Sequence, residues 1–158
     1  MKKGSVAVLS AIVGAVAGAA GSGYLCSKQV NQKSEKVDKF KSYYNMLNQW
    51  LLLKQEGKSL EKYFLDNGYK TIAIYGMGEM GNRLYDELKN TEITVKYAID
   101  KEADSVYSDL EVFTLQDELT EVDAIIVTAT FAFDEIEAEL SKNISCPIVS
   151  LDDVVYEI

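Results

Sequence analysis

The chain has 158 residues, enough for one domain of ordinary size and an appendage, and it carries a formal net charge of −9. It contains no histidine, which excludes sites that need imidazole as a general base or a metal ligand, including Ser-His-Asp and Cys-His arrangements. Its two cysteines, Cys26 and Cys146, lie far apart, so no CxxC zinc motif is present, and a reducing compartment fits best.

Charge is unevenly distributed along the chain. Residues 1–62 carry ten lysines against four acidic residues, a net charge of +6, whereas residues 63–158 carry six basic and twenty-one acidic residues, a net charge of −15. The acidic part would repel a phosphate backbone, so nucleic acid is not expected as a partner. The basic part suits an anionic membrane surface.

The first predicted element is a membrane anchor at residues 1–28. Residues 4–27 contain no charged side chain and are long enough to cross a bilayer as a helix. Lysines are more numerous after this segment than before it, which places the globular part in the cytoplasm. The alternative is a cleaved signal peptide, with Lys2 and Lys3 as its basic region and Ala17-Gly18-Ala19 resembling a cleavage site.

Residues 29–62 are predicted to form a basic, helical juxtamembrane segment, with one helix over 35–55 and a short helix beginning at Ser59. The longer helix carries two apolar stripes at spacings of three and four residues. The stripes are Val37, Phe40, Tyr44, Leu47 and Leu51, and Tyr43, Met46, Trp50 and Leu53. Two adjoining stripes are too wide to leave in water, so we expect the helix to cover a flank of the domain, or alternatively to pair with a second copy of the chain.

A glycine-rich motif follows. Residues 71–75 have the pattern of a short buried strand, Gly76-Met77-Gly78-Glu79-Met80-Gly81 matches G-x-G-x-x-G, and residues 82–89 have the pattern of an amphipathic helix. A second strand over 93–100 ends in Asp100, close to the spacing at which dinucleotide-binding folds place a ribose-binding carboxylate. These features together predict a loop that holds a pyrophosphate at a helix N-terminus.

The predicted ligand-binding residues are backbone and side-chain groups around this loop, and no catalytic or metal-binding residue is predicted. They are Gly76, Met77, Gly78, Glu79, Met80, Gly81, Arg83, Asp100, Thr128 and Thr130. Arg83, in the first helical turn, is expected to offset the charge of Glu79. The alternative is that the glycines only shape a strand–helix turn and that Asp100 merely ends a strand.

The remaining residues alternate between strand and helix patterns. Strands are predicted at 110–114, 123–130 and 146–151, helices at 115–119 and 131–142, and a last turn at 152–158. The alternation predicts an α/β, Rossmann-like domain over 63–158, with a five-stranded parallel sheet of order 3-2-1-4-5 and helices on both faces. A ligand should then lie above the first and fourth strands.

The segment from Tyr63 to Ile158 resembles a bacterial family of small Rossmann modules from polysaccharide biosynthesis, through IAIYGMGEMGNRL, VKYAID, VFTLQDEL and DAIIVTA. The resemblance implies that Gly76, Gly78 and Gly81 contact NAD or a nucleotide-sugar and that polysaccharide-biosynthesis enzymes are partners. The expected function is therefore a membrane-anchored nucleotide-binding module accessory to polysaccharide or cell-envelope biosynthesis. The alternatives are a ligand-free scaffold, or a small NAD-dependent oxidoreductase or epimerase, for which so short a domain leaves little protein to enclose a substrate.

Overall fold

The computed structural model describes residues 36–106 and 108–158. The chain divides into two compact units, Met1–Tyr43 and Tyr44–Ile158. Of the first unit, residues 36–43 are described and are helical. No helix within the described ranges is long and apolar enough to span a bilayer, and the anchor predicted at residues 1–28 lies outside them.

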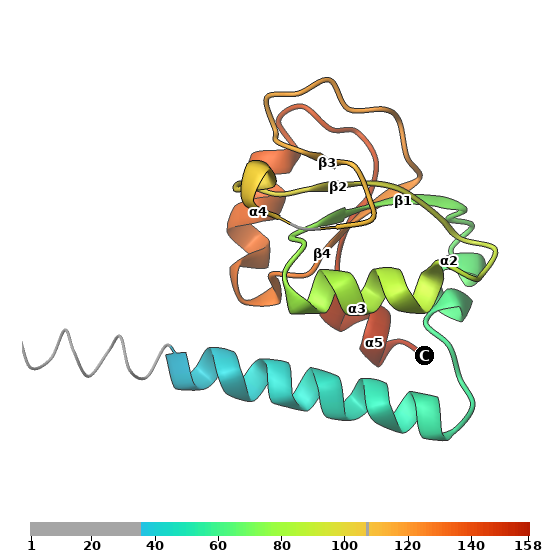
Figure 1. Cartoon of the computed structure of the whole chain (residues 1–158). Coiled ribbons are helices and arrows are strands. Elements are labelled where there is room, and N and C mark those ends of the chain that lie inside the picture. The colour runs from blue at the N-terminus through green and yellow to red at the C-terminus, as the bar shows by residue number, and fades with distance from the viewer. Residues whose placement is uncertain (1–35, 107) are drawn as a thin grey trace, which may run out of the picture. The chain divides into compact units, whose positions relative to one another are not determined.

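The second unit is built on a five-stranded parallel sheet with the order β3-β2-β1-β4-β5 (Figure 1). The strands are β1 (Thr71–Tyr75), β2 (Thr94–Ile99), β3 (Val112–Phe113), β4 (Ala124–Val127) and β5 (Ile148–Ser150). All four neighbouring pairs are parallel. The predicted α/β class and strand order are confirmed. β1 lies at the centre, as its continuous apolar run requires.

Helices cover the sheet and create a core on each side of it. They are α2 (Glu61–Asp66), α3 (Glu79–Leu88), α4 (Phe133–Leu140) and α5 (Leu151–Tyr156). Ile136 and Leu140 of α4 pack with Tyr75, Tyr97 and Ile125 on one face of the sheet. In Figure 1, α3 and α5 lie on the other side of the strands. Alternate residues of β1 thus face different helices, because strand side chains point to opposite faces in turn.

Two sequence predictions need correction. The helix predicted over 115–119 is wrong: residues 115–117 form a turn and a bend. Asp117 accepts hydrogen bonds from the backbone N–H and the hydroxyl of Thr114, at 2.7 and 2.8 Å, and so closes a local turn. So short a segment is in any case marginal as a helix. The helix predicted at 131–142 begins as a 3₁₀ turn at Thr130–Ala132 and becomes α4 only at Phe133.

β1 has its predicted bounds, whereas the other predicted strands are longer than the observed ones. β4 ends at Val127, so Thr128 and Thr130 lie beyond the strand, in the segment that leads to α4. β3 has two residues and β5 three. Edge strands in this sheet are therefore short, which limits the unpaired backbone that they expose.

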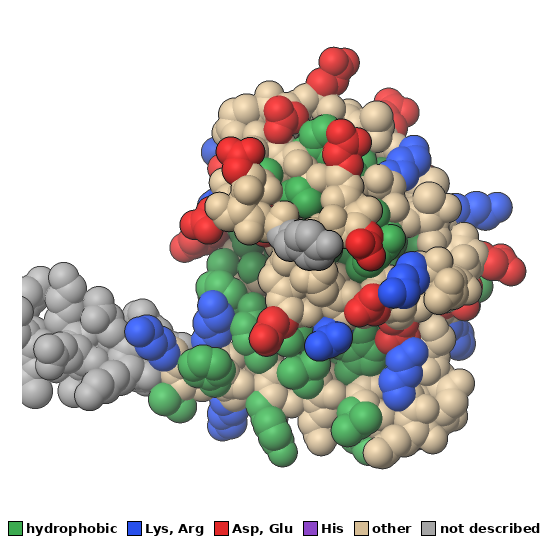
Figure 2. Space-filling model, viewed as in Figure 1, with side chains coloured by type: hydrophobic (Ala, Val, Ile, Leu, Met, Phe, Trp, Pro, Cys, Tyr) green, Lys and Arg blue, Asp and Glu red, His purple; other side chains and the backbone are tan. Residues whose placement is uncertain are grey.

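The two apolar stripes of the helix over residues 36–55 differ in their exposure to solvent. In the second stripe, Met46, Trp50 and Leu53 are buried, with 0, 6 and 3% of their surface exposed. The first stripe is exposed instead, along its whole length: Val37, Phe40, Tyr44, Leu47 and Leu51. Figure 2 shows apolar side chains along this helix at the lower edge of the view. The predicted docking onto the domain is thus confirmed for one stripe, and the compact unit starts before the predicted boundary at residue 63.

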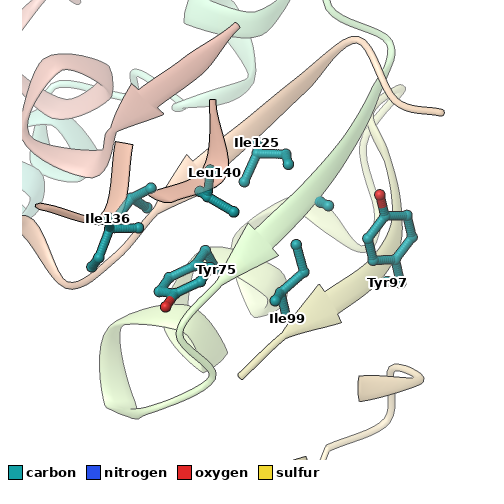
Figure 3. Close-up of a cluster of buried hydrophobic side chains, with 8 residues drawn as sticks. Tyr75, Tyr97, Ile99, Ile125, Ile136 and Leu140 are labelled. Atoms are coloured by element: carbon teal, nitrogen blue, oxygen red, sulfur yellow. The ribbon is translucent and has the colours of Figure 1, made fainter. Parts of the chain in front are cut away.

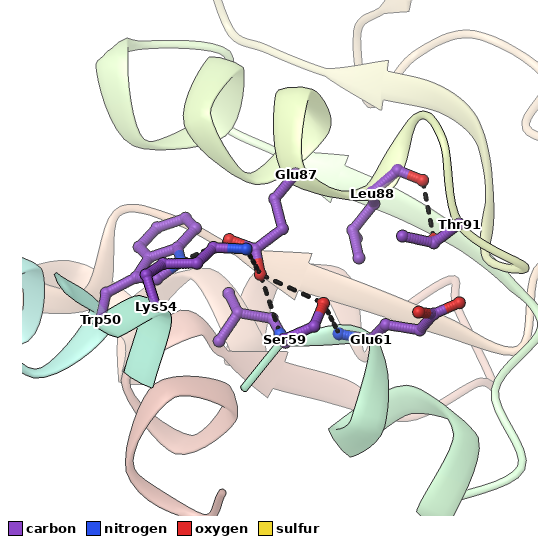
Figure 4. Close-up of polar contacts among 8 residues, drawn as sticks. Trp50, Lys54, Ser59, Glu61, Glu87, Leu88 and Thr91 are labelled. Atoms are coloured by element: carbon purple, nitrogen blue, oxygen red, sulfur yellow. Dashed lines mark hydrogen bonds and ion pairs between the residues drawn. The ribbon is translucent and has the colours of Figure 1, made fainter. Parts of the chain in front are cut away.

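A buried carboxylate fastens this helix to α3. Glu87 Oε2 accepts a hydrogen bond from Trp50 Nε1 at 2.6 Å, and Oε1 accepts one from the Leu60 backbone N–H at 2.9 Å. The Lys54 ammonium lies 2.6 Å from Oε1 (Figure 4). The Glu87 side chain is only 5% exposed, so these donors replace the water that it loses.

Candidate nucleotide-binding site

The turn from β1 into α3 depends on glycine at its first position. Gly76 has a φ of +92°, in the region that side chains other than glycine rarely adopt. A Cβ placed there would also lie 2.8 Å from Thr128 Oγ1. The backbone therefore turns sharply out of the central strand and passes directly under Thr128.

Gly81 is required for a different reason. It lies in the first turn of α3, and a Cβ at this position would lie 2.3 Å from the Gly76 carbonyl oxygen. Such a contact forces the backbone to move, because neither atom belongs to a flexible side chain. Gly81 thus allows the helix to pack closely on the loop, as the sequence pattern predicts.

Gly78 differs from both. It caps α3 in an extended conformation, with φ −72° and ψ −159°, which any residue can adopt. Nothing lies within 4 Å of where its Cβ would be, so no packing against the described residues requires glycine here. No side chain caps the helix, so no side-chain oxygen occupies the first backbone N–H groups of α3.

Backbone and side-chain hydrogen bonds hold the loop in this shape. The Gly76 N–H donates to the Ile99 carbonyl at 2.8 Å, and the Thr128 hydroxyl donates to the Gly76 carbonyl at 2.7 Å. The Asn82 amide donates to the carbonyls of Met77 and Gly78, at 3.1 and 3.0 Å. Asn82 was not among the predicted site residues, although its position four residues after Gly78 places it one helical turn above the loop.

Asp100 stands at the end of β2, next to the loop, as predicted. Its Oδ2 accepts the Met77 N–H at 2.9 Å and its Oδ1 accepts the Glu102 N–H at 3.0 Å. One task of Asp100 is therefore to orient the loop, which the sequence pattern did not reveal. A carboxylate offers about four acceptor positions, so both oxygens keep capacity for a further donor.

The other predicted residues of the loop and helix fall into two groups. Met77 is buried, with 3% of its surface exposed, and Met80 is half-buried. Glu79 is exposed at the first position of α3. Arg83 is also exposed and pairs with Asp86 at 3.7 Å, so its observed partner is not Glu79.

The two threonines after β4 have different surroundings. Thr128 is 4% exposed, and its hydroxyl is engaged with the backbone carbonyls of Tyr75 and Gly76. Thr128 therefore supports the loop from below. Thr130 Oγ1 is buried and has no partner at ordinary hydrogen-bond distance among the described residues. Burial raises the pKa of the Asp152 carboxyl, and an interaction with the Thr130 hydroxyl opposes that rise.

Two cavities open on the α4 face of the sheet. The smaller, of about 280 Å³, lies at the carboxyl ends of β1, β2 and β3 and is lined by Tyr75, Asp100, Lys101, Thr114, Gln116 and Glu139 among others. The larger, of about 790 Å³, extends from Gln116 and Glu139 to Tyr97 and Cys146. It lies along the irregular segment 115–122, where the expected helix is missing. Burial raises the pKa of the Cys146 thiol.

Residues 68–147, just over half of the chain, match the family model described as C2185-like, N-terminal. The chain belongs to this family. It matches no curated protein and no solved structure.

The C2185-like segment contains the parts of the site described above. It runs from just before β1 to just before β5 and includes the glycine loop, Asn82, Asp100 and Thr128. It leaves out Trp50, Lys54 and the rest of the docked helix. Within residues 36–106 and 108–158, no group of three acidic or cysteine side chains is placed to hold a metal ion.

Proposed function

We propose that this C2185-like protein is a Rossmann-type nucleotide-binding module that takes NAD or a nucleotide-sugar at the loop Gly76–Gly81. The doubly wound strand order supports this proposal, because such sheets bind ligands at the carboxyl ends of the strands where the order reverses, here between β1 and β4. The glycine loop lies at that point.

Gly78 is the single observation that carries the proposal. Gly76 and Gly81 are explained by the fold, whereas Gly78 has an ordinary conformation and open space around its missing side chain. A serine or aspartate here would cap the helix better, but its side-chain oxygen would occupy the N–H groups that an anion needs. Glycine leaves them accessible, which is what backbone contact with a pyrophosphate requires.

The residues around the loop can hold such a ligand, although the charge of one of them opposes it. The backbone N–H groups at the start of α3 would hold the pyrophosphate, and Asp100 keeps acceptor capacity for a ribose hydroxyl. The negative charge of Asp100 would repel a 2′-phosphate, so NAD would be favoured over its 2′-phosphorylated form. The exposed Glu79 opposes anion binding, although its charge is well solvated.

Ligand-induced stabilisation of the full chain in mild detergent tests the proposal. The chain would be heated with NAD, NADP, ATP and UDP-glucose, alongside Gly78→Val. We expect one ligand class to raise the melting temperature of the wild-type chain, by the equivalent of about 2.7 kcal/mol at a hundredfold excess over Kd. Gly78→Val should fold normally and lose this response. No response of the wild-type chain to any nucleotide at millimolar concentration would refute the nucleotide-binding function.

We further propose that residues 1–28 anchor the protein, with the second unit in the cytoplasm, where it would serve polysaccharide or cell-envelope biosynthesis. The uncharged run at 4–27 and the excess of lysines after it support this placement. Retention of the chain in the membrane fraction after an alkaline carbonate wash is expected. Release of the chain into the supernatant would contradict membrane anchoring by residues 1–28.

A ligand-free scaffold is the second candidate. The exposed face formed by Tyr44, Leu47, Leu51 and Leu52 on the docked helix favours it, because exposed apolar patches commonly mark interaction surfaces. The Met77 N–H, which points to Asp100, is also unavailable to a phosphate. The thermal-shift experiment separates the two functions, since a scaffold needs no nucleotide.

A further inference from the structure

Two buried tyrosines on neighbouring strands differ in the state of their hydroxyl groups. Tyr75 of β1 and Tyr97 of β2 belong to the same apolar cluster, with 4 and 3% of their surfaces exposed. The Tyr97 hydroxyl donates to the Thr120 carbonyl at 2.7 Å. The Tyr75 hydroxyl is buried and has no partner at ordinary hydrogen-bond distance among the described residues, although the Lys101 ammonium lies near enough to interact with it. Buried hydroxyls nearly always have one, so this exception needs an explanation.

The two hydroxyls point in opposite directions. In Figure 3 the Tyr75 hydroxyl lies beyond the end of the β1 arrow, whereas that of Tyr97 points back toward the other end of the sheet. Tyr75 is therefore directed to the edge that carries the glycine loop. Tyr75 lines the 280 Å³ cavity, and Asp100, which holds the Met77 N–H, lines the same cavity. The cavity is thus next to the loop.

Lys101 and Glu139 also line this cavity. Their charged groups are 3.6 Å apart, and the Lys101 side chain is 69% exposed. A long, solvated ion pair of this kind is weak, so the lysine can move aside for a ligand at low cost. Burial raises the pKa of Tyr75, and this rise outweighs the opposing effects of the Lys101 charge and of its hydrogen bond with the phenol. The phenol therefore stays protonated and can both donate and accept.

The lining suits neutral hydroxyl groups better than a second phosphate. Asp100 and Glu139 supply acceptors and would repel an anion, while Lys101 and Gln116 supply donors. The volume is at the low end for ligand pockets, so the cavity suits one ring rather than a whole dinucleotide.

We propose that the Tyr75 hydroxyl and this cavity receive a polyhydroxylated ring of the nucleotide ligand, either its ribose or the hexose of a nucleotide-sugar. The inference rests on the proposed nucleotide-binding function and adds to it a residue that recognises the sugar. Tyr75 is a binding residue in this proposal, with no part in bond making or breaking.

Affinities of the full chain for matched ligands test the inference. Calorimetry would compare ADP with 2′-deoxy-ADP and 3′-deoxy-ADP, and UDP-glucose with UDP, for wild type, Tyr75→Phe and Tyr97→Phe. We expect Tyr75→Phe to weaken binding of the fully hydroxylated ligand about three- to tenfold, the effect of one hydrogen bond, and to leave the ligand lacking the critical hydroxyl unaffected. Loss of the discrimination between ADP and its deoxy forms would identify the ribose, and loss of the preference for UDP-glucose over UDP would identify the hexose.

Comparing Tyr75→Phe with Tyr97→Phe also distinguishes a role in ligand binding from a role in stabilising the fold. Tyr75→Phe should change the melting temperature of the free protein little, because the interaction of this hydroxyl with the largely exposed Lys101 is weak, whereas Tyr97→Phe should lower it and leave affinity unchanged. If Tyr75→Phe binds every nucleotide as tightly as wild type while Gly78→Val binds none, the sugar-recognition role is wrong and the nucleotide-binding function stands. If the wild-type chain binds no nucleotide, both proposals fall.

Discussion

Helix α3 connects two regions that satisfy their polar groups in opposite ways. At its first turn, Gly78 and Glu79 are exposed and no side chain caps the backbone N–H groups. In its last turn, the Glu87 carboxylate is 5% exposed and receives hydrogen bonds from Trp50 and Leu60 and an ion pair from Lys54. One end of the helix lacks the partners that the other end has in full.

The difference teaches which polar groups to assign to folding and which to binding. A carboxylate near a helix C-terminus is disfavoured by the helix dipole, and a buried one is costly to desolvate. Glu87 is retained there because its donors come from the docked helix, which it fastens to α3. The groups at the first turn have no side-chain cap, which is the arrangement that the proposed nucleotide would need.

Removing the charge of Glu87 is expected to have the largest effect. In Glu87→Gln, an amide N–H₂ group would face donors that now bind carboxylate oxygens, and a half-exposed Lys54 would lose its partner. We expect the free energy of unfolding to fall by about 3 kcal/mol, measured by urea denaturation.

Asp86→Asn is the matched control, because Asp86 precedes Glu87 on the same helix and forms only exposed ion pairs with Lys89 and Arg83. Its effect should be below about 0.5 kcal/mol. A Glu87→Gln variant that unfolds at the same urea concentration as this control would show that the flank is not fastened by the carboxylate.

The glycine pair Gly81 and Gly78 should show the next largest difference. Gly81→Ala places a methyl group against the Gly76 carbonyl and should lower stability by about 2 kcal/mol through forced backbone movement. Gly78→Ala meets no atom within 4 Å and should cost less than about 1 kcal/mol, the difference between glycine and alanine at an N-cap. Chemical denaturation of both variants provides the comparison, and equal losses would mean that Gly78 is also a packing residue.

The sequence predicted the first turn of α3, at Gly78 and Glu79, better than the last turn, at Glu87. The loop is local: a strand, three glycines and a helix follow one another, and each has a pattern that short-range geometry enforces. Strand order was also predictable, because alternating elements with right-handed crossovers leave few parallel arrangements. The roles of Glu87 and Tyr75 depend on residues 37 and 26 positions away, Trp50 and Lys101 respectively, or on a cavity. No periodicity in one segment reports such contacts.

Local patterns also failed where tertiary context outweighed them. Residues 115–119 have helix-forming side chains, yet Asp117 closes a turn on Thr114 instead. Thr128 was predicted as a ligand contact because it stands near the carboxyl end of a predicted strand; in the structure its hydroxyl supports the Gly76 carbonyl, and its contact with a ligand stays a prediction. A single sequence does not distinguish a hydroxyl that binds a ligand from one that supports the loop beneath it.

Tyr63 of α2 should make the stability of the fold depend on pH at strongly alkaline values. Burial, with a smaller contribution from Glu157, raises the pKa of Tyr63 from 10.0 to about 12. The unfolded chain therefore loses this proton near pH 10, while the folded chain keeps it to about pH 12, so stability falls as pH rises through that window. Urea titrations between pH 9 and 11.5 should show a shallower fall for Tyr63→Phe than for wild type, and parallel curves would contradict the assignment.

The smallest expected effect concerns Glu79, and it tests whether the open end of α3 faces an anion at all. Glu79 is exposed at the first helical position, so its charge favours the helix dipole but repels a phosphate held by the same N–H groups. Glu79→Gln should therefore lower stability slightly, by about 0.5 kcal/mol, and raise nucleotide affinity by a few-fold at low salt. Stability and affinity thus move in opposite directions, a combination that no purely structural role of the loop produces. Calorimetric titrations at low and high salt would measure it, since screening should remove the gain in affinity. If Glu79→Gln leaves the affinity at low salt unchanged, the charge of the ligand does not lie at this end of the helix. That result would not bear on the contacts of Glu87 at the other end of α3.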